Sequence, residues 1–252
     1  MFCDFENVAL GVREAKYAQF DMQKVLERLL AKGSIVVKKA YCDWERYKEF
    51  KAAMHGASFE LIEIPHVRQS GKNSADIRMV VDALDLCYTK AHVDTFVIVS
   101  GDSDFSPLVS KLRENAKTVI GVGVKNSSSD LLIANCDEFI YYDDLVRQDE
   151  QKRRATRKRR ETAPAGSAAR TRSRRAFDLM LGTLEALIAE RGAEEKIWGS
   201  MVKQALKRRN PGFNESYYGF RAFSDLLEEA EKKGLIKLEP DEKSGGYVIR
   251  PA

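Results

Sequence analysis

The sequence predicts an α/β fold with a mostly parallel sheet covered by helices on both faces, followed by a small second domain. Three observations predict it. Strand-like and helix-like patterns alternate over residues 1–146, as is typical of parallel sheets. The apolar pattern stops over residues 147–175 and resumes at residue 176. The length of 252 residues suits one ordinary domain and a small one.

The elements of the first part are short and follow one another closely. Residues 1–3 resemble the end of a strand, and residues 20–30 place their large apolar side chains on one helical face. Because only three residues precede Asp4 and a buried strand has about five or six, we expect the chain to continue upstream. We expect further strands at 34–42, 58–65, 95–100, 117–124 and 138–142, and helices at 74–88, 105–113 and 131–134.

The last part has the pattern of a winged helix. Its sequence predicts helices at 177–190, 201–209 and 220–234, a short strand or turn at 196–200, and a hairpin of strands 235–240 and 246–250. Gly234 is placed to end the third helix. Three helices followed by a two-stranded wing are related to the helix-turn-helix. We therefore expect domains at 1–146 and 176–252.

The positive charge is concentrated between these two domains. Residues 147–175 carry 12 Lys and Arg against 3 Asp and Glu, whereas residues 1–146 carry 18 against 22. Such a composition predicts a flexible basic linker, which attracts nucleic acid by counterion release. The alternative is a solubilising spacer.

Cysteine usage and hydropathy indicate a reducing compartment. The four cysteines are scattered without metal-ligand spacing, which predicts reduced thiols. There is no signal peptide and no apolar run of membrane-spanning length, so we expect a cytoplasmic protein without membrane association.

Acidic residues follow two of the predicted strands. Asp4 follows the first strand, Asp102 and Asp104 follow the strand at 95–100, and Asp76 opens a helix that can face the same sheet edge. Carboxylates gathered in one place repel one another unless a cation compensates, and Mg²⁺ or Mn²⁺ prefers oxygen ligands. Asn7 can orient a ligand, or it can simply close a turn.

Each aspartate also has a structural interpretation. Asp102 or Asp104 can cap the helix that contains Pro107, and Asp76 can act through the helix dipole after an Asn73 cap. Asp82 lies six residues after Asp76, about 240° around the helix, so it supports the site or the fold instead of sharing a face with Asp76.

The motifs DFEN, KNSAD with VVDAL, and SGDSDF with PLVSKLR and KTVIGVG resemble the NYN domain, a branch of the PIN-like ribonuclease superfamily. This resemblance implies a Rossmann-like sheet and a Mg²⁺- or Mn²⁺-dependent site that cleaves single-stranded or structured RNA. It implies catalytic and metal-binding roles for Asp4, Asp76, Asp102 and Asp104, a catalytic role for Asn7, and a metal-binding role for Asp82. The likeness extends over nearly all of residues 1–146.

Residues 176–250 resemble the LOTUS domain, also called OST-HTH, a winged helix associated with RNA, including G-rich RNA, and in some relatives with proteins. Cations beside aromatic rings suit phosphate contact and base stacking. The expected RNA-binding residues are His66, Arg68, Lys72, Lys203, Lys207, Arg208, Arg209, Tyr217 and Arg221. The alternatives are a solvated loop for the first three, a solvated helix for the lysines and arginines, and a core position for Tyr218, Phe220 and Phe223.

Together these features predict a metal-dependent ribonuclease in which a metal-activated water attacks the phosphodiester. No Ser/His or Cys/His set accompanies the acids, so no protein nucleophile is expected. The alternatives are a non-catalytic RNA-binding or protein-interaction adaptor, and a phosphatase. The DxD arrangement of phosphoaspartate enzymes is missing after the first strand.

Overall fold

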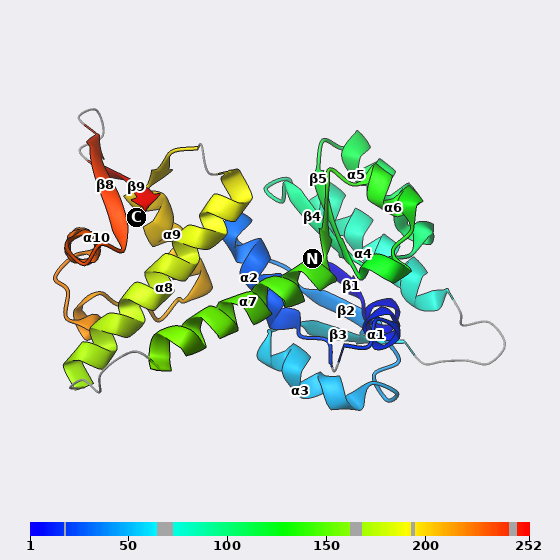
Figure 1. The fold of residues 1–252 in the computed structure, drawn as a ribbon. Coiled ribbons are helices and arrows are strands. Elements are labelled where there is room, and N and C mark those ends of the chain that lie inside the picture. Colours follow the sequence, from blue (N-terminus) through cyan, green and yellow to red (C-terminus); the bar gives the residue numbers. More distant parts are fainter. Residues whose placement is uncertain (18, 65–72, 162–167, 193–194, 242–245) are drawn as a thin grey trace. The chain divides into compact units, whose positions relative to one another are not determined.

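The computed structural model describes residues 1–17, 19–64, 73–161, 168–192, 195–241 and 246–252 (Figure 1). They form two compact units. Unit 1 comprises Met1–Val25 and Ile35–Ala155, and unit 2 comprises Leu26–Ser34 and Thr156–Ala252.

Unit 1 is built on a six-stranded parallel sheet with the order β3-β2-β1-β4-β5-β6 (Figure 1). Its strands are β1 (Phe2–Asp4), β2 (Lys39–Cys42), β3 (Glu60–Glu63), β4 (Thr95–Val99), β5 (Thr118–Gly123) and β6 (Glu138–Tyr141). The strand order reverses between β1 and β4. In open α/β sheets, ligands bind at the carboxyl ends of the strands beside such a reversal.

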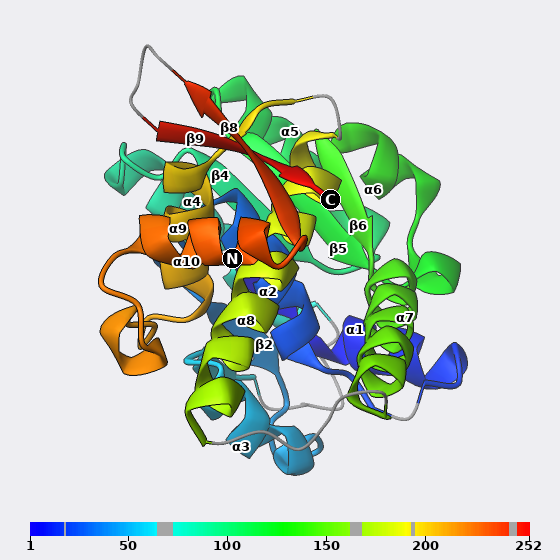
Figure 2. The ribbon, with the colours of Figure 1, turned by 60° about the vertical axis from the view of Figure 1, so that its left-hand side comes forward.

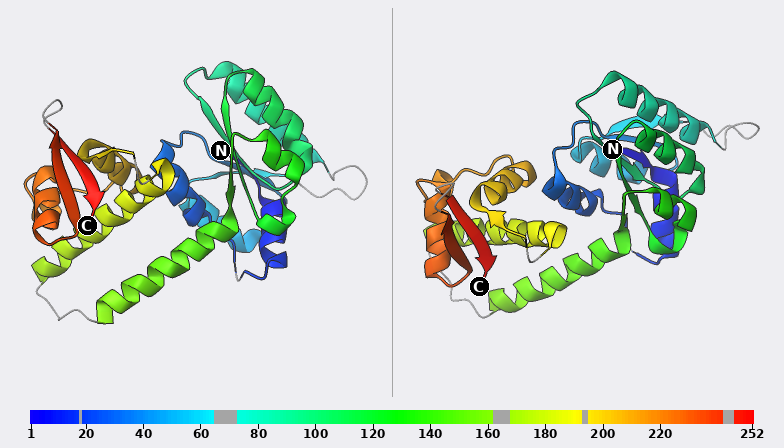
Figure 3. Two further views of the ribbon diagram at one scale, coloured as in Figure 1. Left: turned by 45° about the horizontal axis from the view of Figure 1, so that its top comes forward. Right: turned by 90° about the horizontal axis from the view of Figure 1, so that it is seen from above.

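Helices cover both faces of this sheet (Figure 3). The helices that lie wholly in unit 1 are α1 (Phe5–Glu14), α3 (Lys48–Gly56), α4 (Ser74–Thr89), α5 (Ser106–Glu114) and α6 (Asp130–Asn135), with 3₁₀ turns η1 (Ser103–Phe105) and η2 (Lys125–Ser127). Two further helices, α2 (Met22–Lys32) and α7 (Tyr142–Glu161), have residues in both units. Phe2 and Phe96 of the sheet pack with Met79 of α4 and Leu108 of α5 in one core. The α/β fold predicted from the sequence is confirmed.

Three local features differ from the expectation. No helix was predicted directly after the first strand or at residues 48–56, yet α1 begins at Phe5 with Asp4 as its N-cap and α3 spans Lys48–Gly56. β2 begins at Lys39, so the apolar run at 34–38 precedes the strand instead of forming it. The described part of the chain holds no helix that is both long enough and apolar enough to cross a membrane.

Unit 2 contains the helices and the wing predicted for this part of the chain (Figure 2). Its elements are α8 (Ala168–Arg191), β7 (Ile197–Trp198), α9 (Gly199–Arg209), η3 (Ser216–Tyr218), α10 (Phe223–Lys232), β8 (Ile236–Asp241) and β9 (Gly246–Pro251), and the antiparallel strand order is β7-β9-β8. The left-handed Gly234 ends α10 as expected, while the amide of Leu235 bonds the carbonyl of Ala230. Tyr218 and Phe223 are buried and Phe220 is partly buried, in agreement with their core interpretation.

The segment expected to be a flexible linker has a helical backbone. Helix α7 continues to Glu161 and α8 begins at Ala168, so residues 147–161 and 168–175 are helical, while residues 162–167 lie outside the described part. Arginine, lysine, glutamine and alanine are strong helix formers, so a helix forms here without an apolar stripe. The domain boundaries themselves stay a prediction.

Candidate active site

Asp4 is the centre of the candidate site. It ends β1, and β1 pairs with β4 in the register Cys3 to Val99, so Asp4 and Ser100 leave the sheet side by side. Ser100 Oγ donates to Asp4 Oδ2 at 2.9 Å, and the backbone amide of Asn7 donates to Asp4 Oδ1 at 3.3 Å. Asp4 is only 8% exposed. The sheet therefore holds this carboxylate in one orientation.

A second bond fixes the turn after β4. The backbone amide of Gly101 donates to Asn7 Oδ1 at 2.9 Å, so Asn7 joins the first turn of α1 to the end of β4. Gly101 also lies against the β5–α6 connection, where a Cβ would stand 2.2 Å from the carbonyl oxygen of Ser127. Asn7 thus holds the backbone that carries Asp102, which is a positioning role and more than a turn closure.

Asp102 and Asp104 lie on the turn that starts η1. Asp102 Oδ1 accepts from the amide of Asp104 at 3.0 Å, and Asp102 is the N-cap of η1. Asp102 therefore caps η1, whereas α5, the helix that contains Pro107, begins after Phe105 without a side-chain cap. The charge of Asp102 still acts on Asp4. The amide of Asp102 also donates to Ser100 Oγ at 3.2 Å, which connects it to Asp4 through one hydroxyl. Asp104 is exposed.

The carboxylates of this region are close enough to change one another's ionisation. Burial raises the pKa of Asp4 to about 7, against the opposing hydrogen bond from Ser100, and the charges of Asp76 and Asp102 add to the rise. Burial followed by the charges of Asp102, Asp104 and Glu6 raises the pKa of Asp76 to about 6. Asp76 from α4 thus joins the acids that follow β1 and β4. Asn73 makes no side-chain cap to α4.

The chemistry of this cluster fits a hard divalent cation. All its donors are oxygens, which a hard cation prefers, and burial together with the charges of neighbouring acids raises the pKa values of Asp4 and Asp76. Among the described residues, no group of three or more His, Cys, Asp and Glu side chains already stands in metal-ligand geometry. The carboxylates therefore fit the cation by charge and donor type, and holding it requires side-chain rotation.

Asp82 lies in a different environment. Its carboxylate accepts from Tyr41 at 2.8 Å, from Lys39 at 3.1 Å and from Arg78 at 3.1 Å. Burial acts to raise the pKa of Asp82, but these hydrogen bonds and positive charges outweigh it and lower the pKa. Asp82 therefore joins α4 to β2, and we do not include it among the metal ligands.

Sequence reasoning missed two residues of the cluster. Ser100 is fully buried and bonds both Asp4 and Asp102, and Glu6 contributes charge to Asp76. Ser100 is the first residue after β4, and it reaches Asp4 because β4 lies next to β1 in the sheet. That neighbour relation follows from the strand order, which the sequence alone does not contain.

The predicted RNA-binding residues fall into two groups. His66, Arg68 and Lys72 lie outside the described residues. In unit 2, Lys207 and Arg221 are exposed, Lys203 pairs with Glu215 at 3.2 Å, and Tyr217 is 61% exposed beside Arg172.

Arg208 and Arg209 make structural contacts within unit 2. Arg208 donates to the carbonyls of Leu30 and Ala31 at 3.0 and 3.2 Å. Arg209, whose side chain is 14% exposed, donates to the carbonyl of Gly182 at 2.9 Å. Their guanidinium groups are therefore less available to a ligand than the exposed ammonium group of Lys207 and guanidinium group of Arg221.

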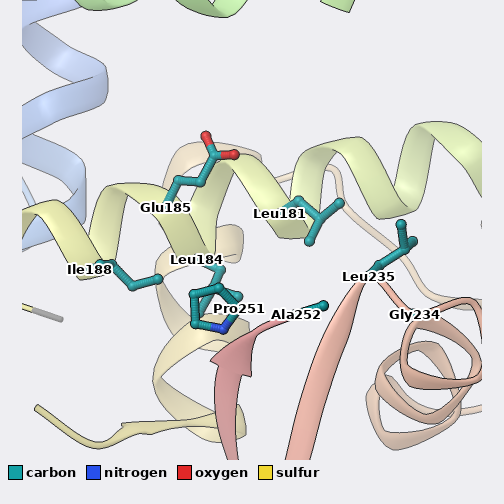
Figure 4. A pocket seen from close by; sticks show the side chains of 8 residues that line it. All are labelled: Leu181, Leu184, Glu185, Ile188, Gly234, Leu235, Pro251 and Ala252. Carbon is teal, nitrogen blue, oxygen red and sulfur yellow. The ribbon is translucent and has the colours of Figure 1, made fainter. Parts of the chain in front are cut away.

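An apolar hollow of about 350 Å³ lies in unit 2 between α8 and the ends of β8 and β9 (Figure 4). Its lining is Leu181, Leu184, Glu185, Ile188, Gly234, Leu235, Pro251 and Ala252. Because these eight residues include an acid and no cation, the hollow does not suit a phosphate.

The fold and the acidic sheet edge define a Rossmann-like protein of the PIN-like nuclease class. The chain belongs to the NYN domain family, whose model matches residues 1–143. This result confirms the resemblance expected for the first domain.

Two similar proteins give further comparisons. An uncharacterized protein of Methanocaldococcus jannaschii is 28% identical over 137 residues, which is 54% of each chain, so this chain spans about half the length of that curated relative. A crystal structure of a protein of unknown function from Vibrio parahaemolyticus is 29% identical, with a TM-score of 0.50, and the match covers 57% of this chain and 91% of that one.

Proposed function

We propose that this protein is a metal-dependent ribonuclease that uses Mg²⁺ or Mn²⁺. The observation that carries the proposal is the meeting of Asp4, Asp76 and Asp102 at the reversal of strand order, with the pKa values of Asp4 and Asp76 raised to about 7 and 6. Family membership supports a nuclease-type hydrolase. Near neutral pH these two acids are close to their pKa values, so a cation can displace the proton that either of them holds.

Asp4, Asp76 and Asp102 would hold the cation, with Asp104 in support. When bound, the cation polarises the phosphodiester and lowers the pKa of an attacking water. Asn7 and Ser100 hold Asp4 and the turn of Asp102 in register, as their bonds to Gly101 and to both acids indicate. Asp104, which is exposed, would orient the incoming water or the leaving group.

Unit 2 is proposed to recruit the RNA. Its helices and wing support the likeness to a LOTUS domain, and the exposed Lys207, Arg221 and Tyr217 supply cations and a stacking surface. The basic segment 147–175 adds salt-sensitive attraction. Single-stranded or structured RNA, including G-rich RNA, is the expected partner, and a protein partner of unit 2 is the alternative.

The test is cleavage of end-labelled single-stranded and G-rich RNAs with Mg²⁺, Mn²⁺ or EDTA, read on a denaturing gel. We expect metal-dependent products from the wild type and from Asp94→Asn, a control at the opposite end of β4. Asp102→Asn keeps an acceptor for the amide of Asp104 and should lose about 100-fold or more in rate. Equal rates for Asp102→Asn and the wild type would overturn the proposed site.

A non-catalytic RNA-binding adaptor is the second candidate. It is favoured by the absence, within the described residues, of three acidic side chains already in ligand geometry. RNA that is retarded in a native gel and stays intact with either metal would support the adaptor and contradict the nuclease.

A further inference from the structure

Helix α4 carries an exposed apolar stripe on the side away from its own core. Ile77, Val81 and Tyr88 are 63%, 55% and 63% exposed. They are three of the six large hydrophobic side chains found exposed in the described part of the chain. The opposite side of α4 is already buried through Met79, Ala83 and Cys87. The helix therefore has two apolar sides, and unit 1 covers one of them.

The spacing of the stripe is that of a helix-pairing seam. Ile77, Val81, Leu84 and Tyr88 are separated by four, three and four residues, which is the spacing of alternating d and a positions in a heptad. Leu84 is partly buried and packs against the core, so it forms the inner edge of the seam. The seam is about 17 Å long at 1.5 Å per residue.

We propose that two copies of this chain associate through α4, antiparallel and about a twofold axis. When α4 of one copy lies antiparallel to α4 of the other, Ile77 faces Tyr88 of the partner copy and Val81 faces Leu84 of the partner copy. Each apolar layer thus has an apolar partner. A twofold axis requires this kind of self-complementary surface, in which each contact occurs twice.

The flanking charges are also complementary under the same reversal. Arg78 and Asp85 occupy the same heptad position one repeat apart, so each faces the other across the antiparallel pair. Arg78 is 55% exposed by its side chain and Asp85 is exposed. In an antiparallel pair of α4 helices, apolar residues face apolar residues and opposite charges face each other. A surface that binds a different partner would not need this complementarity to a second copy of itself. The second copy is therefore the occupant that these observations favour.

The pairing should be weak and reversible. A single short helix pair buries less than the roughly 1,600 Å² of a standard interface. The full chain, examined by sedimentation velocity over a wide concentration range, should shift from monomer to dimer. A strictly monomeric wild type at the highest concentration would overturn the proposal.

Val81→Glu places a charge at the centre of the seam and should weaken dimerisation by about tenfold or more. Val36→Glu is the matched control, because Val36 is 65% exposed and lies off α4. Circular dichroism melting checks that both variants fold. Equal dimerisation of Val81→Glu and Val36→Glu would contradict the assignment of the interface to α4.

A charge reversal tests the antiparallel register. Asp85→Arg places arginine opposite Arg78 of the partner copy and should weaken the dimer, whereas Asp85→Glu keeps the negative charge and should not. Arg78 itself stays unchanged, because it also bonds Asp82 of its own helix. Equal dimerisation of Asp85→Arg and Asp85→Glu would argue against this register. If the wild type is monomeric and Val81→Glu instead weakens RNA retention, the stripe serves RNA, and the proposal of self-association is wrong.

Discussion

Ser100 Oγ donates to Asp4 Oδ2 at 2.9 Å and accepts from the amide of Asp102 at 3.2 Å. One buried hydroxyl therefore connects two carboxylate residues that are almost a hundred positions apart in sequence. Its single proton is directed at Asp4, which favours the ionised form of a carboxyl that burial disfavours. Burial raises the pKa of Asp4 and the hydrogen bond from Ser100 lowers it, so a nearby cation can shift the ionisation of this carboxyl.

Asp4→Asn should stabilise the metal-free protein at alkaline pH. The folded-state pKa of Asp4 is raised from 3.8 to about 7, so between these values the folded chain keeps a proton that the unfolded chain has lost. The free energy of unfolding therefore falls as pH rises through this window and levels off above it.

Urea unfolding in EDTA should show Asp4→Asn more stable than the wild type by at least about 1 kcal/mol at pH 8, with little difference at pH 4. Asp94→Asn serves as the control, since Asp94 stands before β4. If the free energy of unfolding changed with pH in the same way for Asp4→Asn and the wild type, the pKa of Asp4 would not be raised in the folded protein, and the prediction would be wrong.

Mg²⁺ or Mn²⁺ should raise the melting temperature, and more at pH 8 than at pH 5.5. A cation competes with the protons that Asp4 and Asp76 hold below about pH 7 and 6. Differential scanning fluorimetry with each metal measures the shift. Asp94→Asn should keep the shift and Asp76→Asn should lose most of it; an equal shift in both variants would place the cation elsewhere.

Gly101→Ala should destabilise unit 1 by about 1–3 kcal/mol, because the new Cβ would meet backbone atoms of Ser127 and Ser128 that a side-chain rotation cannot relieve. Gly56→Ala provides the contrast. Gly56 ends α3, has no atom within 4 Å of a built Cβ, and should gain up to about 1 kcal/mol. Thermal unfolding with both variants measures the difference, and a neutral Gly101→Ala would contradict the close approach.

Arg209→Ala and Lys207→Ala should separate stability from RNA binding. Arg209 donates to the carbonyl of Gly182 and its side chain is only 14% exposed, so its loss removes a charged hydrogen bond and buried packing and should destabilise unit 2 by about 1–3 kcal/mol. Lys207 is exposed, and its loss should weaken RNA retention and reduce the salt dependence with little effect on melting. A native gel and a melting curve are needed for each variant, and weaker RNA retention by Arg209→Ala without a change in melting would reverse these assignments.

Much of unit 1 was predictable because its signals are local. The run TFVIV formed β4, and Asp102 fell on the turn behind it. Ser100 was not predictable as a site residue, since its role depends on β1 and β4 being neighbours. Helix formation in α7 was missed because it rests on backbone propensity, whereas the expected pattern was apolar periodicity. The engagement of Arg209 with α8 is a tertiary contact that a count of basic residues does not contain.

Helix α1 begins at Phe5, the residue after β1 ends at Asp4, so no loop separates strand and helix. An insertion at this junction would move Asp4 off its cap and out of register with Ser100. A change of length at this junction would therefore act directly on the first acid of the candidate site, with no loop residues in between to absorb it.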